Sequence, residues 1–283
     1  DVAPSRGLGD VYKRQDVEPD MKDTQHYALY ASVPSLILPD KTYYEENHPQ
    51  AEALLSVYRQ MVLALFERAG YDNNFAQATL EKALAFDKSL APVQKDSTER
   101  ADYAKSYNKY SFEDYTAFSK SVDLGAFAKK LIGQTPDQVN VDEPKYYEAL
   151  ETLINPDTFE NFKSWLLVKT LISVSTLLDD DTRVLAGTYS RALSGSKEAM
   201  KAQKAVFYLA TGQFSQVVGL YYAHKYFGAK AKADVHHMVE KMIDVYKNRL
   251  ASNDWLSDDT RQKAIVKLLS LIHISEPTRR SYI

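Results

Sequence analysis

Residues 49–70 read PQAEALLSVYRQMVLALFERAG, with apolar side chains at the three- and four-residue spacing of one helix face. The apolar positions are Ala53, Leu54, Val57, Tyr58, Met61 and Leu65. Pro49 suits the first turn of a helix, because a proline there sacrifices no hydrogen bond, and Gly70 suits the stop after the last turn. The stretch therefore predicts an amphipathic helix over residues 49–70.

The same helical period continues through most of the chain. Further helices are predicted over residues 73–90, after Ser111, from Thr135-Pro136, and over 144–154, 155–178, 201–227, 234–250 and 258–268. Asn155 and Ser257 are expected N-caps, and Gly228 is expected to end the helix over 201–227. Only residues 139–141 suggest a strand, and no repeat of 34 or 40 residues is present. The predicted fold class is all-α, a multi-helix globular domain.

Composition excludes several classes of function. The chain has 283 residues, 35 Lys and Arg against 38 Asp and Glu, 20 Tyr and no Cys. Without cysteine there is no disulfide scaffold, cysteine-ligated zinc, iron–sulfur cluster or thiol nucleophile. The net charge of −3 provides no basic surface for nucleic acid, and the longest apolar stretch is too short to cross a bilayer.

Two peptides near the ends of the chain are related through the DNA that would encode them. Residues 5–15 read SRGLGDVYKRQ and residues 269–279 read LSLIHISEPTR, and one DNA segment can encode the two peptides on its opposite strands. The segment looks like the transposase end sequence used to prepare sequencing libraries. We therefore expect residues 1–15 and 269–283 to be adapter-derived and to pack poorly. Residues 16–268 are the expected native domain, incomplete at both ends, which leaves an export signal open.

The sequence lacks three common catalytic and metal- or phosphate-binding motifs. It contains no His-Glu-x-x-His string, no Gly-x-Ser-x-Gly elbow and no Walker loop. His236, Glu240 and Asp244 would share one helix face at i, i+4 and i+8, and could hold a metal or form a carboxylate–imidazole hydrogen bond. A solvated polar face is the more common use of such a pattern, and His237 points elsewhere.

Two other patterns have both a functional and a structural interpretation. Asp179-Asp180-Asp181 could bind a cation, but it lacks the spacing and glycine of a calcium loop, so ending one helix and capping the next is favoured. The pairs Tyr43-Tyr44, Tyr146-Tyr147 and Tyr221-Tyr222 could stack on a ligand. Packing between helices is the more frequent use of such rings.

Several short strings, taken together, resemble one protein family. They are LPDKTYY at 38–44, VNVDEPKYY at 139–147, FKSW at 162–165, YSRALSG at 189–195, VGLYY at 218–222, KYF at 225–227, and Trp255-Leu256 with Thr260 and Lys263-Ala264. In this order and spacing they resemble the N-terminal region of the neprilysin and endothelin-converting-enzyme family of zinc metalloendopeptidases, most closely the bacterial oligopeptidase O type.

The resemblance implies a function for the intact protein. It implies a helical domain that covers a thermolysin-like catalytic domain and lets peptides, rather than folded proteins, reach the zinc. The family's zinc ligands lie beyond the C-terminal end of this chain, so no catalytic, cofactor or metal residue is assigned here, and Glu240-x-x-x-Asp244 only imitates a ligand motif. Zinc belongs to the intact enzyme, and the fragment alone is expected to be inactive.

The resemblance also indicates the partners and the cellular location of the protein. The expected partners are peptide substrates and the missing C-terminal catalytic domain, whose absence should leave apolar surface exposed. A chain without cysteine favours the bacterial, cytoplasmic branch, since animal members use disulfides. The alternatives are a non-catalytic helical peptide-binding or scaffold domain, and a metal site on the His236 face.

Overall fold

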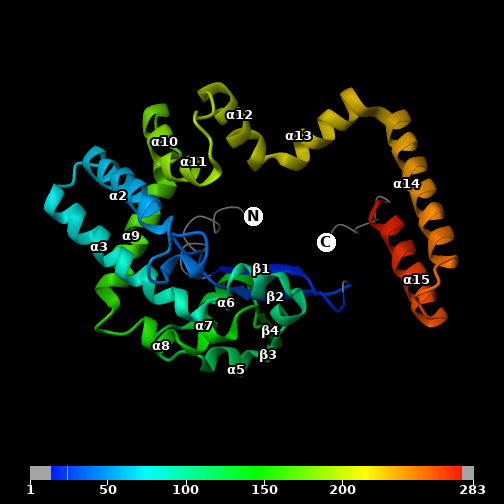
Figure 1. Cartoon of the computed structure of the whole chain (residues 1–283), viewed down its shortest axis with the longest axis horizontal. Coiled ribbons are helices and arrows are strands. Elements are labelled where there is room, and N and C mark those ends of the chain that lie inside the picture. The colour runs from blue at the N-terminus through cyan, green and yellow to red at the C-terminus, as the bar shows by residue number, and fades with distance from the viewer. Residues whose placement is uncertain (1–13, 24, 276–283) are drawn as a thin grey trace. The chain divides into compact units, whose positions relative to one another are not determined.

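The computed structural model describes residues 14–23 and 25–275, with side chains as far as residue 268. The chain divides into two compact units, Asp1–Met200 and Lys201–Ile283 (Figure 1). Most of the described residues are helical, which confirms the predicted helical domain. No helix in these ranges has the length and apolar character needed to cross a membrane.

The first unit contains a four-stranded sheet in addition to its helices. The strand order is β1 (Arg14–Pro19), β2 (Tyr27–Ser32), β4 (Gln138–Val141) and β3 (Lys109–Ser111). β1 pairs antiparallel with β2, β2 parallel with β4, and β4 antiparallel with β3. Only β4 matches a strand suggested by the sequence.

Two predictions made from the sequence are wrong in and around the sheet. The helix expected from Thr135-Pro136 is absent, because these residues lie in the loop that leads into β4. Gln15 is expected to pack poorly, but it lies in β1, pairs with Ala31 of β2 and is buried. Its side-chain amide donates a hydrogen bond to the Tyr115 hydroxyl. Its strand hydrogen bonds come from the backbone, which any residue can supply. Residues 1–13 and 276–283 lie outside the described part.

Three long and two short helices pack against one another and supply much of the core of the first unit. These are α2 (Ala51–Arg68), α3 (Asn73–Leu90), α9 (Phe159–Ser175), α10 (Asp180–Ala186) and α11 (Thr188–Ser194). Their buried side chains include Val62, Leu65, Phe66, Leu80, Trp165 and Val168. The first two confirm the predicted helices to within about two residues. The third begins later than predicted, because Asn155 accepts hydrogen bonds from the Asp157 and Thr158 amides in a turn ahead of the helix.

Shorter elements connect the sheet to these helices. They are η2 (Lys41–Tyr44), η3 (Ala91–Val93), α4 (Ser97–Ala101), η4 (Tyr103–Ser106), α5 (Phe112–Ala117), α6 (Leu124–Ile132), α7 (Pro144–Glu148) and α8 (Leu150–Leu153). Ser111 caps α5 as predicted, its hydroxyl accepting from the Asp114 amide at 3.0 Å. The helix predicted over 144–154 is divided into α7 and α8, which meet at Ala149.

The described residues of the second unit form helices joined by short turns, and none of them is in a strand. It comprises α12 (Ala202–Gln213), α13 (Ser215–Tyr222), a π-helical turn η5 (Ala223–Phe227), α14 (Gly228–Ala251) and α15 (Asp258–Ser275). The single helix predicted over 201–227 is broken at Phe214, whose φ of −117° and ψ of 30° lie outside the helical region. Gly228 takes a positive φ of 70°, which suits glycine and separates the π turn from α14.

Candidate functional site

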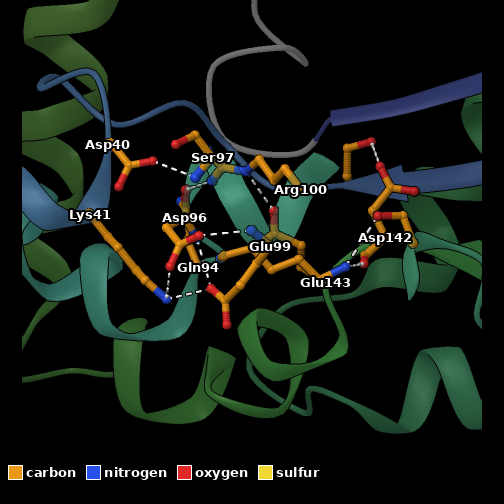
Figure 2. Close-up of polar contacts among 12 residues, drawn as sticks. Asp40, Lys41, Gln94, Asp96, Ser97, Glu99, Arg100, Asp142 and Glu143 are labelled. Atoms are coloured by element: carbon orange, nitrogen blue, oxygen red, sulfur yellow. Dashed lines mark hydrogen bonds and ion pairs between the residues drawn. The ribbon is translucent and has the colours of Figure 1, made fainter. Parts of the chain in front are cut away.

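A network of charged side chains joins three segments of the first unit that are far apart in sequence (Figure 2). The segments are the start of η2, the loop into α4, and the residues after β4. Asp40 links the first two, because one of its oxygens accepts from the Thr42 amide at 3.0 Å and the other from the Ser97 amide at 2.7 Å. Asp96 then caps α4 by accepting from the Glu99 amide at 2.8 Å.

One side of the network is an ion pair near the surface. The Lys41 ammonium lies 2.5 Å from a Glu99 carboxylate oxygen and 3.5 Å from Asp96. The hydrogen bond from Lys41 lowers the pKa of Glu99 to about 2. Because these groups are partly exposed, the pair orients the start of α4 and contributes little to stability.

The other side is a buried carboxylate, Glu143. It accepts from the Arg100 guanidinium at 3.1 Å and from the Lys95 backbone amide at 2.6 Å. Arg100 also donates to the side-chain oxygen Oε1 of Gln94 at 3.0 Å, and the side-chain amide of Gln94 donates in turn to the Pro34 backbone carbonyl at 2.8 Å. A continuous chain of hydrogen bonds thus connects the residues after β4 with the segment after β2.

Asp142, next to Glu143 in the sequence, is a carboxylate of the network whose pKa is raised. The Ser32 hydroxyl donates to it at 2.5 Å, and burial, followed by the neighbouring charges of Glu143 and Glu18, raises its pKa. Lys95 lies close by, but its ammonium donates to backbone carbonyls, including that of Asp142 at 2.9 Å.

Part of the network lines a cleft of about 670 Å³. The segment 33–39 lines the same cleft, as do two carboxylates of β1, Asp16 and Glu18. Polar side chains that line it are hydrogen-bonded within the protein, among them Ser32 with Asp142. These contacts fix the segments in place.

A second cluster, centred on Asp87, forms hydrogen bonds with the segment 35–44. Asp87 is 1% exposed and accepts from the Ile37 amide at 3.0 and 3.2 Å, from the Trp165 indole at 2.9 Å and from the Tyr44 hydroxyl. Lys169 lies 4.6 Å from the centre of the Trp165 ring and donates to the Ser35 carbonyl at 2.5 Å. Burial raises the pKa of Asp87 and lowers that of Lys169.

The tyrosine pairs have different roles. Tyr44 is a hydrogen-bond donor in the Asp87 cluster, and Tyr147 is buried, its hydroxyl donating to the Ser32 carbonyl at 2.8 Å. Tyr146 is buried against Tyr147, with ring centroids 5.2 Å apart. These residues agree with the packing interpretation. Tyr221 and Tyr222, in contrast, are each 60% exposed.

The residues of the His236 face contact one another and their neighbours on the surface of α14. The His236 ring nitrogen lies 3.4 Å from Glu240, and the His237 ring nitrogen lies 3.7 Å from the same carboxylate, so His237 does not point elsewhere as expected. Asp244 pairs with Lys247 at 3.7 Å. Within the described ranges, no group of three His, Cys, Asp or Glu side chains could hold a metal ion, so these residues do not fit zinc.

Asp179 has the capping role predicted from the sequence. It accepts from the Thr182 amide at 3.0 Å and from the Thr182 hydroxyl at 2.6 Å, at the start of α10. Its neighbours Asp180 and Asp181 occupy the first turn, where negative charge is favourable.

Sequence reasoning missed the residues that organise the site, namely Asp87, Arg100 and Glu143. One signal was available for Asp87. It falls among the core positions of the helix over 73–90, beside Leu80, Ala83 and Leu90, where an ionisable side chain is rare unless it is paired. Arg100 and Glu143 lie 43 positions apart, and no local pattern joins them.

Comparisons with known proteins identify the family. The model of peptidase family M13 matches residues 5–274. The chain is 41% identical over 252 residues to a neutral endopeptidase of Lactococcus lactis, covering 89% of this chain and 40% of that protein. It is also 41% identical to a putative zinc metalloproteinase of Streptococcus gordonii, covering 89% of this chain and 45% of that one.

A solved structure confirms the fold. The crystal structure of PepO from Lactobacillus rhamnosis superposes with a TM-score of 0.83 at 33% identity, over 93% of this chain and 42% of that one. The chain therefore spans about two fifths of the length of these relatives. On this evidence, the chain belongs to peptidase family M13.

Proposed function

We propose that this chain is the N-terminal part of a zinc-dependent endopeptidase that hydrolyses oligopeptides. The observation that carries the proposal is the match to peptidase family M13 over residues 5–274, together with 41% identity to a neutral endopeptidase. In this proposal the chain supplies the helical walls that restrict access to the catalytic centre, which lies in the remaining part of the protein.

The described residues support a role without direct chemistry. Since no group among them fits a zinc ion, the metal and the hydrolytic step are assigned to the rest of the longer protein. The hydrogen-bonded segments around Asp87 and Glu143 would give these walls a defined shape. Because the chain has no cysteine and its 41%-identical relatives are bacterial, we propose a cytoplasmic protein of a bacterium.

The source gene and its product test this proposal. One continuous long read across the locus should show a frame that passes residue 268 into His-Glu-x-x-His and a later Glu-x-x-x-Asp, with neither terminal adapter peptide encoded. The longer protein should cleave oligopeptides, lose this activity with a zinc chelator and regain it with added zinc. The 283-residue chain should cleave none.

A different result would favour a different function. If the frame stops near residue 268 in genomic DNA, the protein is a free-standing helical peptide-binding or scaffold domain. If the frame continues but encodes no zinc motif, the fold is retained without the peptidase activity.

A further inference from the structure

The second unit has an unusually apolar surface. Of the large apolar side chains that are exposed in the described ranges, nineteen lie within residues 201–268 and twelve in the first unit. Among the described residues 201–268, Ile243 on α14 is the one apolar side chain that is buried. A unit of this size normally forms a core of its own, so these helices lack most of the packing that would stabilise them.

Apolar side chains surround the middle of α12. Its consecutive residues Val206, Phe207, Tyr208 and Leu209 are 62%, 59%, 53% and 47% exposed. Consecutive positions on a helix are separated by about 100°, so these four side chains point in directions that surround the helix. An amphipathic helix such as α2 buries one face only, whereas a helix that is apolar all round is of the interior type.

α13 has the same character. From Phe214 to Tyr222 the only polar side chains are Ser215 and Gln216, and none is charged. The apolar side chains Val217, Leu220, Tyr221 and Tyr222 are each at least 60% exposed and again lie on more than one face. α14 differs, because its exposed apolar residues Val235, Met238, Met242 and Val245 follow one helical stripe.

We propose that α12 and α13 are interior helices of the longer protein, surrounded on all sides by the polypeptide that follows this chain. We choose this following polypeptide as the neighbour of α12 and α13 because the chain covers only 40% of the length of a relative that is 41% identical to it. The first unit already has a continuous core of its own. This inference rests on the proposed function only in assuming that the protein continues beyond residue 268.

The proposal differs from a lid that rests on a second domain. A lid contacts its partner with one face and leaves the other face in water, so its helices are amphipathic. Helices that are apolar all round require neighbours on both sides, which means that the following polypeptide wraps around α12 and α13. α14 would contribute a single face to the same interface.

The absence of cysteine allows a direct test by thiol labelling. Single cysteines replace Val206, Phe207, Tyr208 or Leu209 in the 283-residue chain and in the longer protein from the source gene. Val206 and Tyr208 lie on nearly opposite sides of the helix, about 200° apart. Tyr103→Cys, at a residue that is 74% exposed in the first unit, provides the reactive control, and unsubstituted longer protein gives the background.

The expected result is rapid maleimide labelling at all four positions in the 283-residue chain and labelling slowed roughly 100-fold or more at all four in the longer protein. Reaction at Val206→Cys or Tyr208→Cys alone in the longer protein would establish a one-sided interface and overturn the proposal. Protection already present in the 283-residue chain would mean that the first unit covers α12, and would also overturn it.

Two further measurements keep the test independent of the variants and of the enzyme activity. Hydrogen exchange of the unsubstituted longer protein should show α12 and α13 amides as protected as those of α3, and fast exchange would contradict the proposal even if a cysteine variant fails to fold. Peptide hydrolysis is measured separately. Protection without hydrolysis would leave this inference standing and refute the proposed function, and a gene that ends near residue 268 would refute both.

Discussion

Asp87 is the residue on which the position of the segment 35–44 most depends. Its carboxylate is buried and accepts hydrogen bonds from that segment, through Ile37 and Tyr44, and from α9, through Trp165. Tyr189 on α11 adds a bond to the Ile37 carbonyl at 2.7 Å. A carboxylate has two acceptor oxygens, whereas an amide side chain has one and an apolar side chain has none.

Asp87→Asn is therefore expected to destabilise the first unit by about 3 kcal/mol, because the carboxamide directs an N–H group toward these donors and leaves Lys169 without its counter-charge. Urea unfolding followed by tryptophan fluorescence reports on this region, since Trp165 contacts the cluster. Asp157→Asn, at an exposed aspartate, is the matched control and should change stability by less than about 0.5 kcal/mol. Equal effects of the two substitutions would disprove the role of Asp87.

Glu151 is expected to make stability depend on pH in the acid range. The Ser121 amide, the Ser119 and Ser121 hydroxyls and the Lys120 amide donate to it and lower its pKa from 4.5 to about 2. A lowered pKa in the folded state contributes stability above pH 4.5, and this contribution is lost as the pH falls toward 2. Wild type should therefore exceed Glu151→Gln in stability at pH 7, and the difference should shrink below pH 4. A constant difference across this range would contradict the assignment.

At the scale of single elements, the helix termini obey local rules closely. Asp72, Asp96, Ser111, Asp123 and Asp179 each accept a hydrogen bond from a backbone amide in the first turn of the helix that follows. Such a cap satisfies a backbone amide that has no partner within the helix. The starts of these five helices are thus set by a side chain only a few residues away, whereas α2 and α9 begin without such a cap.

Asp179→Ala should lower the stability of the first unit by about 1 kcal/mol, since it removes the cap of α10 and the contact with Thr182. Asp181→Ala is the control two positions away, because Asp181 lies in the first turn and is not the cap. It should cost no more than about 0.5 kcal/mol. Chemical unfolding of both variants separates the two roles, and a larger loss with Asp181→Ala would exclude Asp179 as the cap.

On the scale of the whole molecule, the two units differ in how they are stabilised. The first unit combines a sheet, helices and a continuous core that includes Phe66, Leu80 and Trp165. The second contains helices whose apolar side chains are mostly exposed. Local opening is easiest where few apolar side chains are buried, so the second unit should open first.

Limited proteolysis of the 283-residue chain should reveal this difference. Trypsin sites occur in both units, and we expect the first cuts within residues 201–268, with a product that contains the first unit surviving longer. Mass spectrometry of the early products identifies the sites. Early cleavage within α2, α3 or α9 would show that the first unit is not the more stable part.

The sequence by itself determined the helical class, the cap residues Ser111 and Asp179, the bounds of α2 and α3, and the family. These features depend on side chains within a few positions of one another, or on strings in a fixed order. The sequence also placed the positive φ of Gly228 at the end of a helical segment. It did not predict the break at Phe214, because the helical period continues through that residue.

Only the tertiary structure decided the sheet and the polar clusters. β2 pairs with β4 although more than 100 residues separate Tyr30 from Asn140, and Asp87 contacts Trp165 across 78 positions. Short strands carry a weak period, and their pairing depends on backbone hydrogen bonds that any sequence can form once the chain brings them together. The partners of a buried carboxylate are likewise chosen by the packing of distant helices, which local spacing does not encode.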